Sequence, residues 1–487
     1  MRKVILLVLD GAGYHADPHG NAVTSETLPS LFAQMDREGF AVLAAAEESV
    51  GLEAGQVGNS EAGHLTIGAG RMIPSMCRRI LEAHGDGSWA ADPAWGRVGS
   101  VLHLVGLLSD AGVHGLDRTI GQAAANARAN GVAEVVVHPI LDGVDSLAGT
   151  APALLARLRE TLAGLDGVRL GVIQGRKHTN DRSGDLDFTR VATDALRGVT
   201  ELPTFDDALL ADHLTREGES TFPAHLAPGG RTIADGEPVL QTSHRADRAR
   251  QLVRVLSETQ PMYLLVEPGE GIPREHVFLP QPPVDGGLAQ VLKGAGLESV
   301  RIAEKCKFPH VTFFFNGFDA GAEGEGRCIP SIPEAEIRTN PAMSAEEVTD
   351  AICAALAEPD RRVVVANLAN LDQVGHLGDV ELARQAAAAV DAAYTRIAEA
   401  ARQHGWTLLV TSDHGNAERC VGDDGGPFGS HTERPVPFFA QAAPDLRLRW
   451  TAREGSLANV AGTLLTALDV PLPADFEPSL LEFEPAN

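Results

Sequence analysis

A serine lies in a loop of small residues that could carry nucleophilic chemistry. The stretch GQVGNSEAGH covers residues 55–64, with Ser60 near its middle and His64 four residues further on. A serine hydroxyl is a weak nucleophile at its ordinary pKa, and coordination to a metal is one way to activate it. Gly58 and Gly63 would let the backbone approach a phosphate closely. The loop predicts a nucleophilic Ser60 if metal ligands lie nearby, and an ordinary turn residue if they do not.

Carboxylate and imidazole side chains recur in a pattern that suits a metal centre. They come from the stretches NLDQVGH, TSDHGNAE and GSHTERPVPF and from the end of the first apolar run: Asp10, Asp372, His376, Asp413, His414 and His431. Carboxylates combined with imidazoles favour Mn²⁺ or Zn²⁺ over Ca²⁺, and the lack of thiolates disfavours a structural zinc site. Two such ions about 3.5–4 Å apart can clamp a phosphoryl group and activate an oxygen nucleophile. The set therefore predicts metal-assisted phosphoryl transfer.

The composition describes an acidic globular protein. The chain has 487 residues, of which 44% are hydrophobic and 22% charged, and its formal net charge at pH 7 is −26. This length predicts two or more domains. The negative charge argues against non-specific binding to nucleic acid or to an anionic membrane. The same charge suits a protein that binds divalent cations.

The cysteines and the first residues indicate a compartment. The five cysteines are scattered with no CxxC pair, which favours a reducing compartment over a disulfide framework. The segment MRKVILLVLDG has two basic residues and a short apolar run, but it lacks a small-residue cleavage site and is typical of a buried strand. No stretch approaches the roughly 18 apolar residues of a membrane span. We therefore expect a cytoplasmic protein.

Short apolar runs alternate with longer helical segments, which predicts an α/β fold with mostly parallel strands. The expected strands are residues 3–10, 101–110, 133–142, 168–176, 262–267, 310–317, 361–368 and 406–413. One expected helix, residues 343–359, opens on a capping box formed by Ser344 and Glu347. Another, residues 380–405, ends at Gly405.

Several polar residues follow the expected strands directly. They are Asp10, Asp110, Asp142, Arg176 and Asp413. Ligands bind beyond the carboxyl ends of strands in open α/β sheets, so this placement predicts site chemistry. Helix N-caps also favour aspartate at such positions, which is the structural alternative for each aspartate taken alone.

Two stretches predict domain junctions. They are GAGRMIPS at residues 68–75 and the Pro- and Gly-rich LPQPPVDGG at residues 279–287. If both are hinges, residues 76–282 form one domain. Residues 1–75 and 283–487 then join to form the other.

Taken together, these segments resemble the cofactor-independent phosphoglycerate mutases, which belong to the alkaline phosphatase superfamily. The resemblance runs nearly end to end, through VLDG, GQVGNSEAGHLTIGAGR, GLLSDAGVH, LDGVD, RADRARQL, RIAEKCKFPHVTFFFNG, NLANLDQVGH, SDHGNAE and SHTERPVPF. It implies two α/β domains. One is a split phosphatase-like domain that binds metal, and the other is an inserted transferase domain that binds substrate.

The resemblance also implies a role for each matching residue. One manganese ion would be held by Asp372, His376 and His431. A second would be held by Asp10, Ser60, Asp413 and His414. Zn²⁺, Mg²⁺ and Co²⁺ are the alternative metals. Ser60 would become phosphoserine, and Lys307 would neutralise phosphate charge beside the metals. The substrate would be held in the middle domain by His114, Asp145, Arg176, Arg182, Arg245 and Arg248.

The implied reaction is the interconversion of 2- and 3-phosphoglycerate by a monomer. A phosphoserine splits one transfer into two in-line displacements, between which the bound glycerate presents its other hydroxyl. Asp145 is the expected base for that hydroxyl. The arginines suit the substrate because planar guanidinium groups bind carboxylates through two hydrogen bonds.

The chain departs from the family pattern in the half that would hold glycerate. Val144 stands where the family has an arginine, and SGDLDFTR at residues 183–190 replaces a basic and aromatic stretch. Lys177 and His178 stand where the family has tyrosines. The loss of a guanidinium predicts weak mutase activity unless Lys177 or His178 compensates for it.

These departures leave three alternatives open. The first is a transferase of phosphonate biosynthesis that moves a phosphonoformyl group from a CMP-activated donor to a hydroxyl of 3-phosphoglycerate. The second is a non-catalytic phosphoglycerate-binding protein, which the complete metal set disfavours. The third is a phosphatase, which the inserted domain disfavours because hydrolysis needs no pocket that shields phosphoserine from water.

Overall fold

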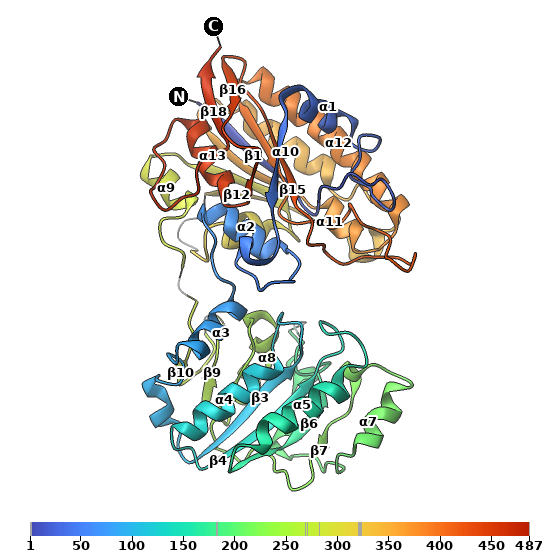
Figure 1. Ribbon diagram of the computed structural model, residues 1–487, viewed down its shortest axis with the longest axis vertical. Helices are drawn as coiled ribbons and strands as arrows, with labels where there is room; N and C mark the ends of the chain where they lie inside the picture. Colours follow the sequence, from blue (N-terminus) through green and yellow to red (C-terminus); the bar gives the residue numbers. More distant parts are fainter. Residues whose placement is uncertain are drawn as a thin grey trace. The chain divides into compact units, whose positions relative to one another are not determined.

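The chain forms two compact units (Figure 1). The computed structural model describes residues 2–181, 184–267, 269, 271–281, 283–319 and 324–486. Unit 1 comprises residues 1–75 and 282–487, and unit 2 comprises residues 76–281. Each unit has helices packed on a mostly parallel sheet. The predicted fold class, with one α/β domain inserted into another, is therefore confirmed.

Unit 1 is built on a sheet with the strand order β12-β11-β13-β1-β14-β15-β2-β17. The strands are β1 (Val4–Leu9), β2 (Phe40–Ala44), β11 (Ser299–Glu304), β12 (Glu325–Ile329), β13 (Val363–Leu368), β14 (Thr407–Thr411), β15 (Val436–Gln441) and β17 (Glu454–Ser456). β1 runs parallel to β13 and β14, with Val4 opposite Val363 and Thr407. A separate ribbon pairs β16 (Leu446–Trp450) with β18 (Leu481–Pro485).

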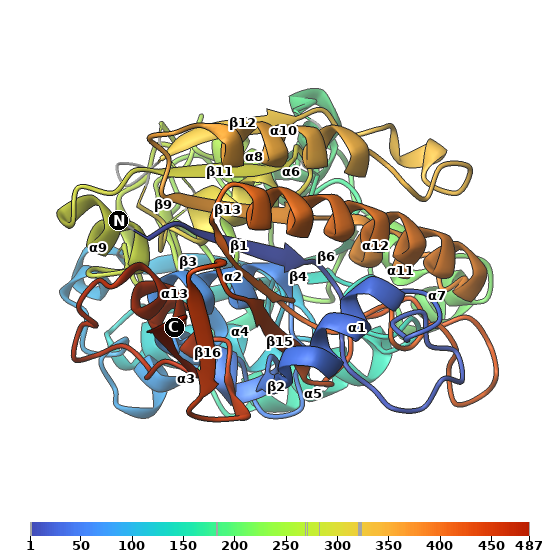
Figure 2. The same cartoon turned by 90° about the horizontal axis from the view of Figure 1, so that it is seen from above.

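Both faces of the unit 1 sheet are buried. Side chains at alternate positions of β1 join two different hydrophobic clusters. One cluster includes α1 (Pro29–Glu38), α10 (Ala345–Ala357), α11 (Asn370–Gly375) and α12 (Val380–Gln403). The other includes α2 (Ser60–Ala69), α9 (Leu288–Gly294) and α13 (Asn459–Leu468), and Figure 2 shows α12 and α13 on opposite sides of β1. A strand covered on both faces is apolar throughout, which explains the uninterrupted run VILLVL.

Unit 2 repeats this layered plan with the strand order β10-β9-β8-β3-β4-β6-β7, and β5 also pairs with β4. The strands are β3 (Val101–Leu108), β4 (Glu134–Leu141), β5 (Val168–Leu170), β6 (Val172–Gly175), β7 (His225–Leu226), β8 (Val239–Gln241), β9 (Met262–Leu264) and β10 (His276–Val277). One cluster holds α3 (Met76–Gly85), α4 (Asp117–Ala129), α5 (Ala151–Ala163) and α7 (Asp207–Leu214). The other holds α6 (Leu186–Arg197) and α8 (Ala246–Leu256).

Two local predictions are wrong. Residues 310–317 were expected to form a strand, but His310–Phe314 form a π-helix. This helix packs against α2, where a Cβ on Gly68 would come within 1.8 Å of the carbonyl oxygen of Phe315. A short apolar run does not distinguish a buried strand from a buried helix, and only this tertiary packing decides between them.

The predicted capping box of α10 is the second error. The hydroxyl of Ser344 donates to the carbonyl oxygen of Pro330 at 2.9 Å instead of capping the helix. The backbone N–H of Ser344 donates to Oε1 of Glu304 at 3.0 Å, so Glu347 is not its partner. Tertiary hydrogen bonds have replaced the local ones, which sequence spacing cannot reveal.

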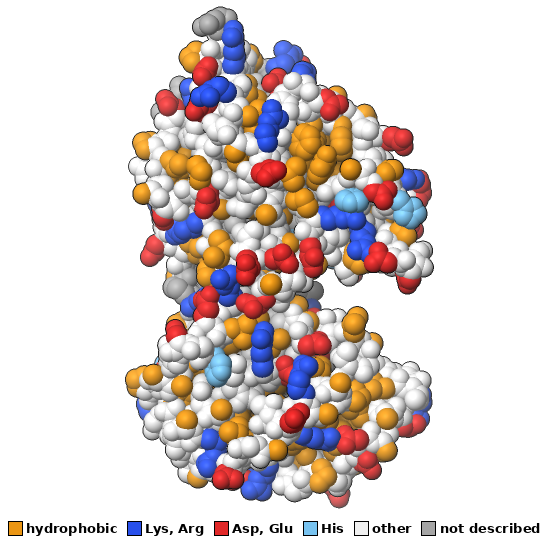
Figure 3. Space-filling view, in the orientation of Figure 1, with side chains coloured by type: hydrophobic (Ala, Val, Ile, Leu, Met, Phe, Trp, Pro, Cys, Tyr) orange, Lys and Arg blue, Asp and Glu red, His pale blue; other side chains and the backbone are white. Residues whose placement is uncertain are grey.

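The surface of each unit carries charged and apolar side chains together. Figure 3 shows acidic, basic and apolar side chains intermixed on one face of each unit. Among the described residues, no helix combines the length and the apolar character needed to cross a membrane.

Unit 2 buries a short chain of hydrogen bonds between histidines. The backbone N–H of Val172 donates to Nδ1 of His138 at 2.9 Å, so the proton of His138 is on Nε2 and is donated to Nδ1 of His103, also 2.9 Å away. The Nε2–H of His103 donates to Glu237 at 2.8 Å. This order of donors requires both rings to be neutral. Burial lowers the pKa of both histidines, that of His138 well below its usual value.

We expect this histidine chain to make the protein sensitive to acid. Unfolding exposes the two rings, which then bind protons at a higher pH than in the folded state. The free energy of unfolding should therefore fall as the pH drops below about 6.5, by up to about 1.4 kcal/mol per pH unit for each histidine. Urea unfolding between pH 7.5 and pH 5 should show a smaller slope for His103→Gln than for wild type. The exposed-site control His84→Gln should keep the wild-type slope. Equal slopes for all three proteins would refute this assignment.

Candidate active site

The carboxyl ends of the parallel strands in unit 1 bring the predicted metal ligands together. Asp10 follows β1, and Asp413 and His414 follow β14. Asp372 lies on α11, directly after β13, and His376 follows the end of this helix. Parallel neighbours end at the same edge of a sheet, so these side chains meet there despite their separation in the sequence.

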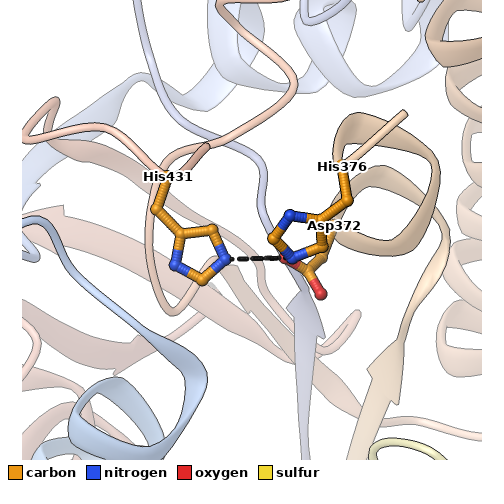
Figure 4. A group of neighbouring side chains, drawn as sticks. All are labelled: Asp372, His376 and His431. Atoms are coloured by element: carbon orange, nitrogen blue, oxygen red, sulfur yellow. Dashed lines mark hydrogen bonds and ion pairs between the residues drawn. The ribbon is translucent and has the colours of Figure 1, made fainter. Parts of the chain in front are cut away.

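Asp372, His376 and His431 form one group of ligand atoms (Figure 4). Oδ1 of Asp372 lies 3.3 Å from Nε2 of His376 and 3.1 Å from Nε2 of His431, and the two Nε2 atoms are 3.3 Å apart. The Nδ1 atoms donate at 2.8 Å to the carbonyl oxygens of Gly429 and Gly58 respectively. In neutral rings the Nε2 lone pairs therefore converge on the carboxylate oxygen. Such convergence, with each Nδ1–H fixed by a carbonyl, is typical of histidines that bind metal.

The hydroxyl of Ser60 lies in a neighbouring group. Its Oγ is 2.9 Å from Nε2 of His414 and 3.3 Å from Oδ1 of Asp10. Nζ of Lys307 donates to the same Oγ at 2.7 Å. Burial lowers the pKa of His414 to about 3, so its ring is neutral. Ligand atoms of Asp10, Asp372 and His414 all lie within 4.8 Å of one another, which makes them a second candidate group.

Helix capping and close packing hold Ser60 in place. Asn59 precedes α2, and its side chain accepts the N–H of Ala62 at 2.9 Å. A Cβ on Gly63 would come within 2.4 Å of the carbonyl oxygen of Asp413, so only glycine lets the helix pack this closely. Gly63 was expected to let the backbone approach a phosphate. It instead lets α2 pack closely against the backbone of Asp413.

Three carboxylates are buried around a single ammonium group. Asp10, Asp372 and Asp413 are at most 1% exposed. In the described part of the chain, Lys307 is the one lysine or arginine within ion-pair distance of them, 2.6 Å from Asp10 and 2.7 Å from Asp372. Burial, reinforced by Asp413, raises the pKa of Asp10 to about 7. Burial alone would lower the pKa of Lys307, but Asp10 and Asp372 raise it above its usual value.

This excess of buried negative charge fits divalent cations. An unpaired buried charge is costly, and bound cations are a common way to balance it. Among the described residues, Oδ2 of Asp413 is buried and receives no well-directed hydrogen bond, although Nδ1 of His64 lies 3.2 Å away. An acceptor left open among carboxylates and imidazoles is available to a metal. The chemistry of the residues present therefore fits a divalent metal ion.

Glu418 ties together the loops that carry these ligands. Its carboxylate accepts the backbone N–H of Gly13 at 3.1 Å, the N–H of Asn416 at 2.8 Å and the hydroxyl of Thr432. These partners belong to the loops that follow Asp10, His414 and His431 in the sequence. One buried carboxylate therefore fixes three ligand-bearing segments relative to one another.

A second polar cluster lies in unit 2. Nδ1 of His114 donates to Oδ2 of Asp145 at 2.6 Å, and Nη1 of Arg176 lies 2.9 Å from the same oxygen. Nη1 of Arg176 also donates to Oδ1 of the buried Asp142 at 2.5 Å. Burial alone would raise the pKa of Asp145, but His114 and Arg176 lower it, so Asp145 is ionised at neutral pH. The structure thus brings three of the predicted substrate residues into direct contact.

The remaining predicted substrate residues belong to two segments. Arg245 immediately precedes α8, and Arg248 lies in its first turn. The hydroxyl of Ser243 donates to the carbonyl oxygens of His114 and Arg245, which links these two backbones. Arg248 donates at 3.4 Å to a carbonyl oxygen of the segment after β6. Arg182 lies outside the described residues.

Sequence reasoning gave no role to several buried residues of the two clusters. They are His64, Asn367, Asn416 and Glu418 in unit 1, and Asp142 as the partner of Arg176 in unit 2. A signal existed for His64, because it follows Ser60 by four residues and residues at that spacing share a helix face. A signal also existed for Glu418, which closely follows two predicted ligands. Asn367 lies within an apolar strand, and the sequence offers no comparable signal for it.

Comparison with known proteins identifies the family. The model of the Metalloenzyme superfamily matches residues 2–472. A 2,3-bisphosphoglycerate-independent phosphoglycerate mutase from Cyanothece sp. is 35% identical over 97% of this chain and 94% of its own length. One from Moorella thermoacetica is 36% identical over 97% of each chain. The chain belongs to the 2,3-bisphosphoglycerate-independent phosphoglycerate mutase family.

A solved structure from this mutase family has the same fold. The Leishmania mexicana phosphoglycerate mutase, described at low cobalt concentration, superimposes with a TM-score of 0.81 and 27% sequence identity. The match covers 99% of this chain and 98% of that one.

The departures from the mutase family pattern include an exposed side chain beside the unit 2 cluster. Val144 precedes Asp145, and its side chain is 65% exposed. His178 packs on Phe188, with ring centroids 4.2 Å apart and with Nδ1 donating to the carbonyl oxygen of Phe188 at 3.2 Å. This engagement argues against His178 as a replacement for the missing guanidinium.

We expect a divalent metal to stabilise the folded protein. Mn²⁺ added to chelator-treated protein should raise the thermal unfolding temperature, since an ion at a hundred times its dissociation constant contributes about 2.7 kcal/mol. Asp372→Asn should reduce this gain because it removes a ligand charge. Asp423→Asn, at an exposed carboxylate in a surface loop, should retain it. Unfolding temperatures that do not respond to Mn²⁺ in wild type would contradict the metal site.

Proposed function

We propose that this protein interconverts 2- and 3-phosphoglycerate by way of a phosphoserine at Ser60. The observation that carries the proposal is the position of this hydroxyl, within 3.3 Å of Asp10, His414 and Lys307 at the start of α2. The relatives described above carry the mutase name, and none of them supports the phosphonate alternative.

Two divalent ions would be bound in unit 1, which we propose to be the metal-binding, phosphatase-like domain. Asp372, His376 and His431 would hold the first ion. Asp10, Ser60, Asp413 and His414 would hold the second. When bound, the ions would neutralise phosphoryl oxygens and lower the pKa of the serine hydroxyl. Mixed carboxylate and imidazole donors support Mn²⁺ as the metal.

Ser60 is the proposed nucleophile, and Lys307 is proposed to stabilise it. Nζ of Lys307 already donates to Oγ at 2.7 Å, so the ammonium group can stabilise negative charge on that oxygen when the hydroxyl proton leaves. The same contact would stabilise Oγ when it becomes the leaving group of the return step. Ser60 begins α2, and the N-terminus of a helix favours an anionic phosphoserine.

The proposed reaction consists of two balanced transfers. In the first, a bond forms between Oγ of Ser60 and phosphorus while the bond from phosphorus to the glycerate oxygen breaks. The departing glycerate oxygen takes a proton. In the second, the other glycerate hydroxyl loses its proton and attacks phosphorus, and the bond to Oγ breaks. The number of phosphoryl groups and protons is unchanged over the cycle.

Unit 2 is proposed to hold the glycerate. Asp145 is ionised and can accept the proton of the attacking hydroxyl, with His114 hydrogen-bonded to it at 2.6 Å. The carboxylate and phosphate of the substrate would be held by Arg176, Arg182, Arg245 and Arg248. Asp142 keeps Arg176 in position, because a buried ion pair joins the two side chains.

We further propose that the protein works as a cytoplasmic monomer. The proposal of a monomer is supported because a single chain supplies every proposed metal ligand and every proposed substrate residue. A phosphorylated three-carbon acid is the one partner that the mechanism needs. The preserved unit 2 speaks against a phosphatase, because hydrolysis of phosphoserine would need no second group of substrate residues.

Replacing the nucleophile should stop group transfer without emptying the metal centre. For Ser60→Ala we expect mutase activity to fall by roughly a thousandfold or more. Mn²⁺ binding should remain largely intact, because three side-chain ligands of that ion are unchanged. Ser49→Ala is the control, because the hydroxyl of Ser49 donates to the carbonyl oxygen of Ala46 and not to the proposed metal ligands. This variant should keep its mutase activity. Near-normal turnover in Ser60→Ala would return this serine to the status of a turn residue.

A guanidinium at position 144 should raise mutase activity. Val144 is exposed beside Asp145, so Val144→Arg can be accommodated and can add a charge-assisted hydrogen bond to the substrate. A bond worth about 1.5–3 kcal/mol corresponds to a gain of roughly ten- to a hundred-and-fifty-fold in kcat/KM. The assay is interconversion of the two phosphoglycerates coupled to enolase. Leu147→Arg, which adds the same charge at an exposed position three residues on, is the matched control. Lower activity in Val144→Arg than in wild type would show that the missing arginine is harmless drift.

A further inference from the structure

α2 carries a second polar side chain at the metal centre, and the proposed reaction gives it no role. His64 lies one turn after Ser60 and is completely buried. Its Nδ1 is 2.9 Å from the carbonyl oxygen of Ser60 and 3.2 Å from Oδ2 of Asp413. Its Nε2 is 3.2 Å from Nδ2 of Asn367. His64 therefore contacts both the nucleophile's backbone and a predicted metal ligand.

The hydrogen bonds of Asn367 determine which nitrogen of His64 carries the proton. Nδ2 of Asn367 donates to Oδ2 of Asp10 at 2.7 Å, and the carbonyl oxygen of Ser60, which faces Nδ1 of His64 at 2.9 Å, can only accept. The amide group of Asn367 must therefore face Asp10, and its second N–H points at Nε2 of His64. This leaves Nε2 as an acceptor and puts the ring proton on Nδ1. The two oxygens that face Nδ1 are both acceptors, so the assignment is consistent at each end.

This tautomer excludes His64 as a metal ligand. Ligand atoms of Asp10, His64 and Asp413 lie close enough to one another to hold an ion. However, the His64 nitrogen that faces Asp413 carries a proton, and the other nitrogen is occupied by Asn367. A protonated nitrogen cannot donate a lone pair, and this N–H, which donates to the carbonyl oxygen of Ser60, places its partial positive charge beside the carboxylate of Asp413.

We propose that His64 and Asn367 are a pair of positioning residues for the second metal site. The pair forms a continuous chain of contacts from Asp10 through Asn367 and His64 to Asp413. It thereby restricts the rotation of two carboxylates that would otherwise repel each other. The link from His64 to the carbonyl oxygen of Ser60 also fixes the first turn of α2, which carries the nucleophile. Loss of such supporting hydrogen bonds typically lowers metal affinity 10- to 100-fold.

The inference rests on the proposed two-ion centre. One titration tests separately whether two ions bind and whether His64 and Asn367 position the second ion. Chelator-treated protein is titrated with Mn²⁺ by calorimetry, and the spin coupling between neighbouring ions is followed by electron paramagnetic resonance. Wild type should bind two ions. A single ion in wild type would contradict the proposed centre itself, whereas two ions in wild type make the variants a test of the positioning pair.

His64→Leu should bind the first ion normally and the second 10- to 100-fold more weakly, with loss of the spin-coupled signal. His64→Asn should recover part of this affinity, because an amide N–H can take the place of Nδ1–H. Asn367→Leu keeps the branched shape of the side chain without its amide hydrogens, and it should show the same selective loss from the other end of this series of contacts. The double variant should be little worse than either single one, since the two residues act as a unit. Thr66→Val, a buried change on the same helix, should behave as wild type.

Two results would overturn the inference while leaving the metal centre intact. The first is unchanged affinity for both ions in His64→Leu and in Asn367→Leu. The second is an equal weakening of both ions together with a lower unfolding temperature, which would show that the pair has only a structural role. Turnover provides a further readout. Saturating Mn²⁺ should restore most of kcat in His64→Leu while KM for phosphoglycerate stays at the wild-type value.

Discussion

Three buried carboxylates that share one ammonium group are the constraint on which the rest of the structure depends. Asp10, Asp372 and Asp413 could not remain ionised side by side at the edge of a buried sheet without added positive charge, and Lys307 supplies only part of it. The imidazoles of His376, His414 and His431 present Nε2 lone pairs rather than protons, so they add no compensation when neutral. The residues around these carboxylates hold them close together despite their mutual repulsion, in an arrangement that divalent cations would stabilise.

Much of that arrangement consists of hydrogen bonds that hold the proposed metal ligands in place. Glu418 joins three loops, and backbone carbonyl oxygens set the tautomers of His376 and His431. The side-chain amide of Asn367 donates to the carboxylate of Asp10. Unit 2 uses the same strategy on a smaller scale, where Asp142 and Asp145 share the guanidinium of Arg176. In both units the side chains that we propose for the chemistry are held in place by hydrogen bonds from groups behind them.

The parts of this structure that follow from sequence are those with a local or repeated signal. Apolar runs ending in aspartate predicted the strands and the edge where these residues lie, and the family resemblance grouped the expected ligands around Ser60. The strand expected at residues 310–317 failed because an apolar run fits a buried helix equally well, and the packing of Phe315 on Gly68 decides the outcome. The capping box failed because Ser344 found partners distant in sequence. Asn367 escaped notice for a related reason: its role arises from contacts with Asp10 and His64 that only the folded chain brings together.

The order of the strands has a consequence for how the chain is made. β1 lies between β13 and β14, and β2 pairs with β15, so the sheet of unit 1 needs strands from both ends of the chain. Unit 2 takes all its strands from the uninterrupted segment between them. During synthesis from the N-terminus, unit 2 can fold while β1 still waits for its neighbours with an exposed apolar run. Nascent chains are thus at risk of aggregation until late in translation. Ser60 emerges early, but the imidazole and carboxylate groups that contact its hydroxyl in the folded protein are complete only after His414 has been added.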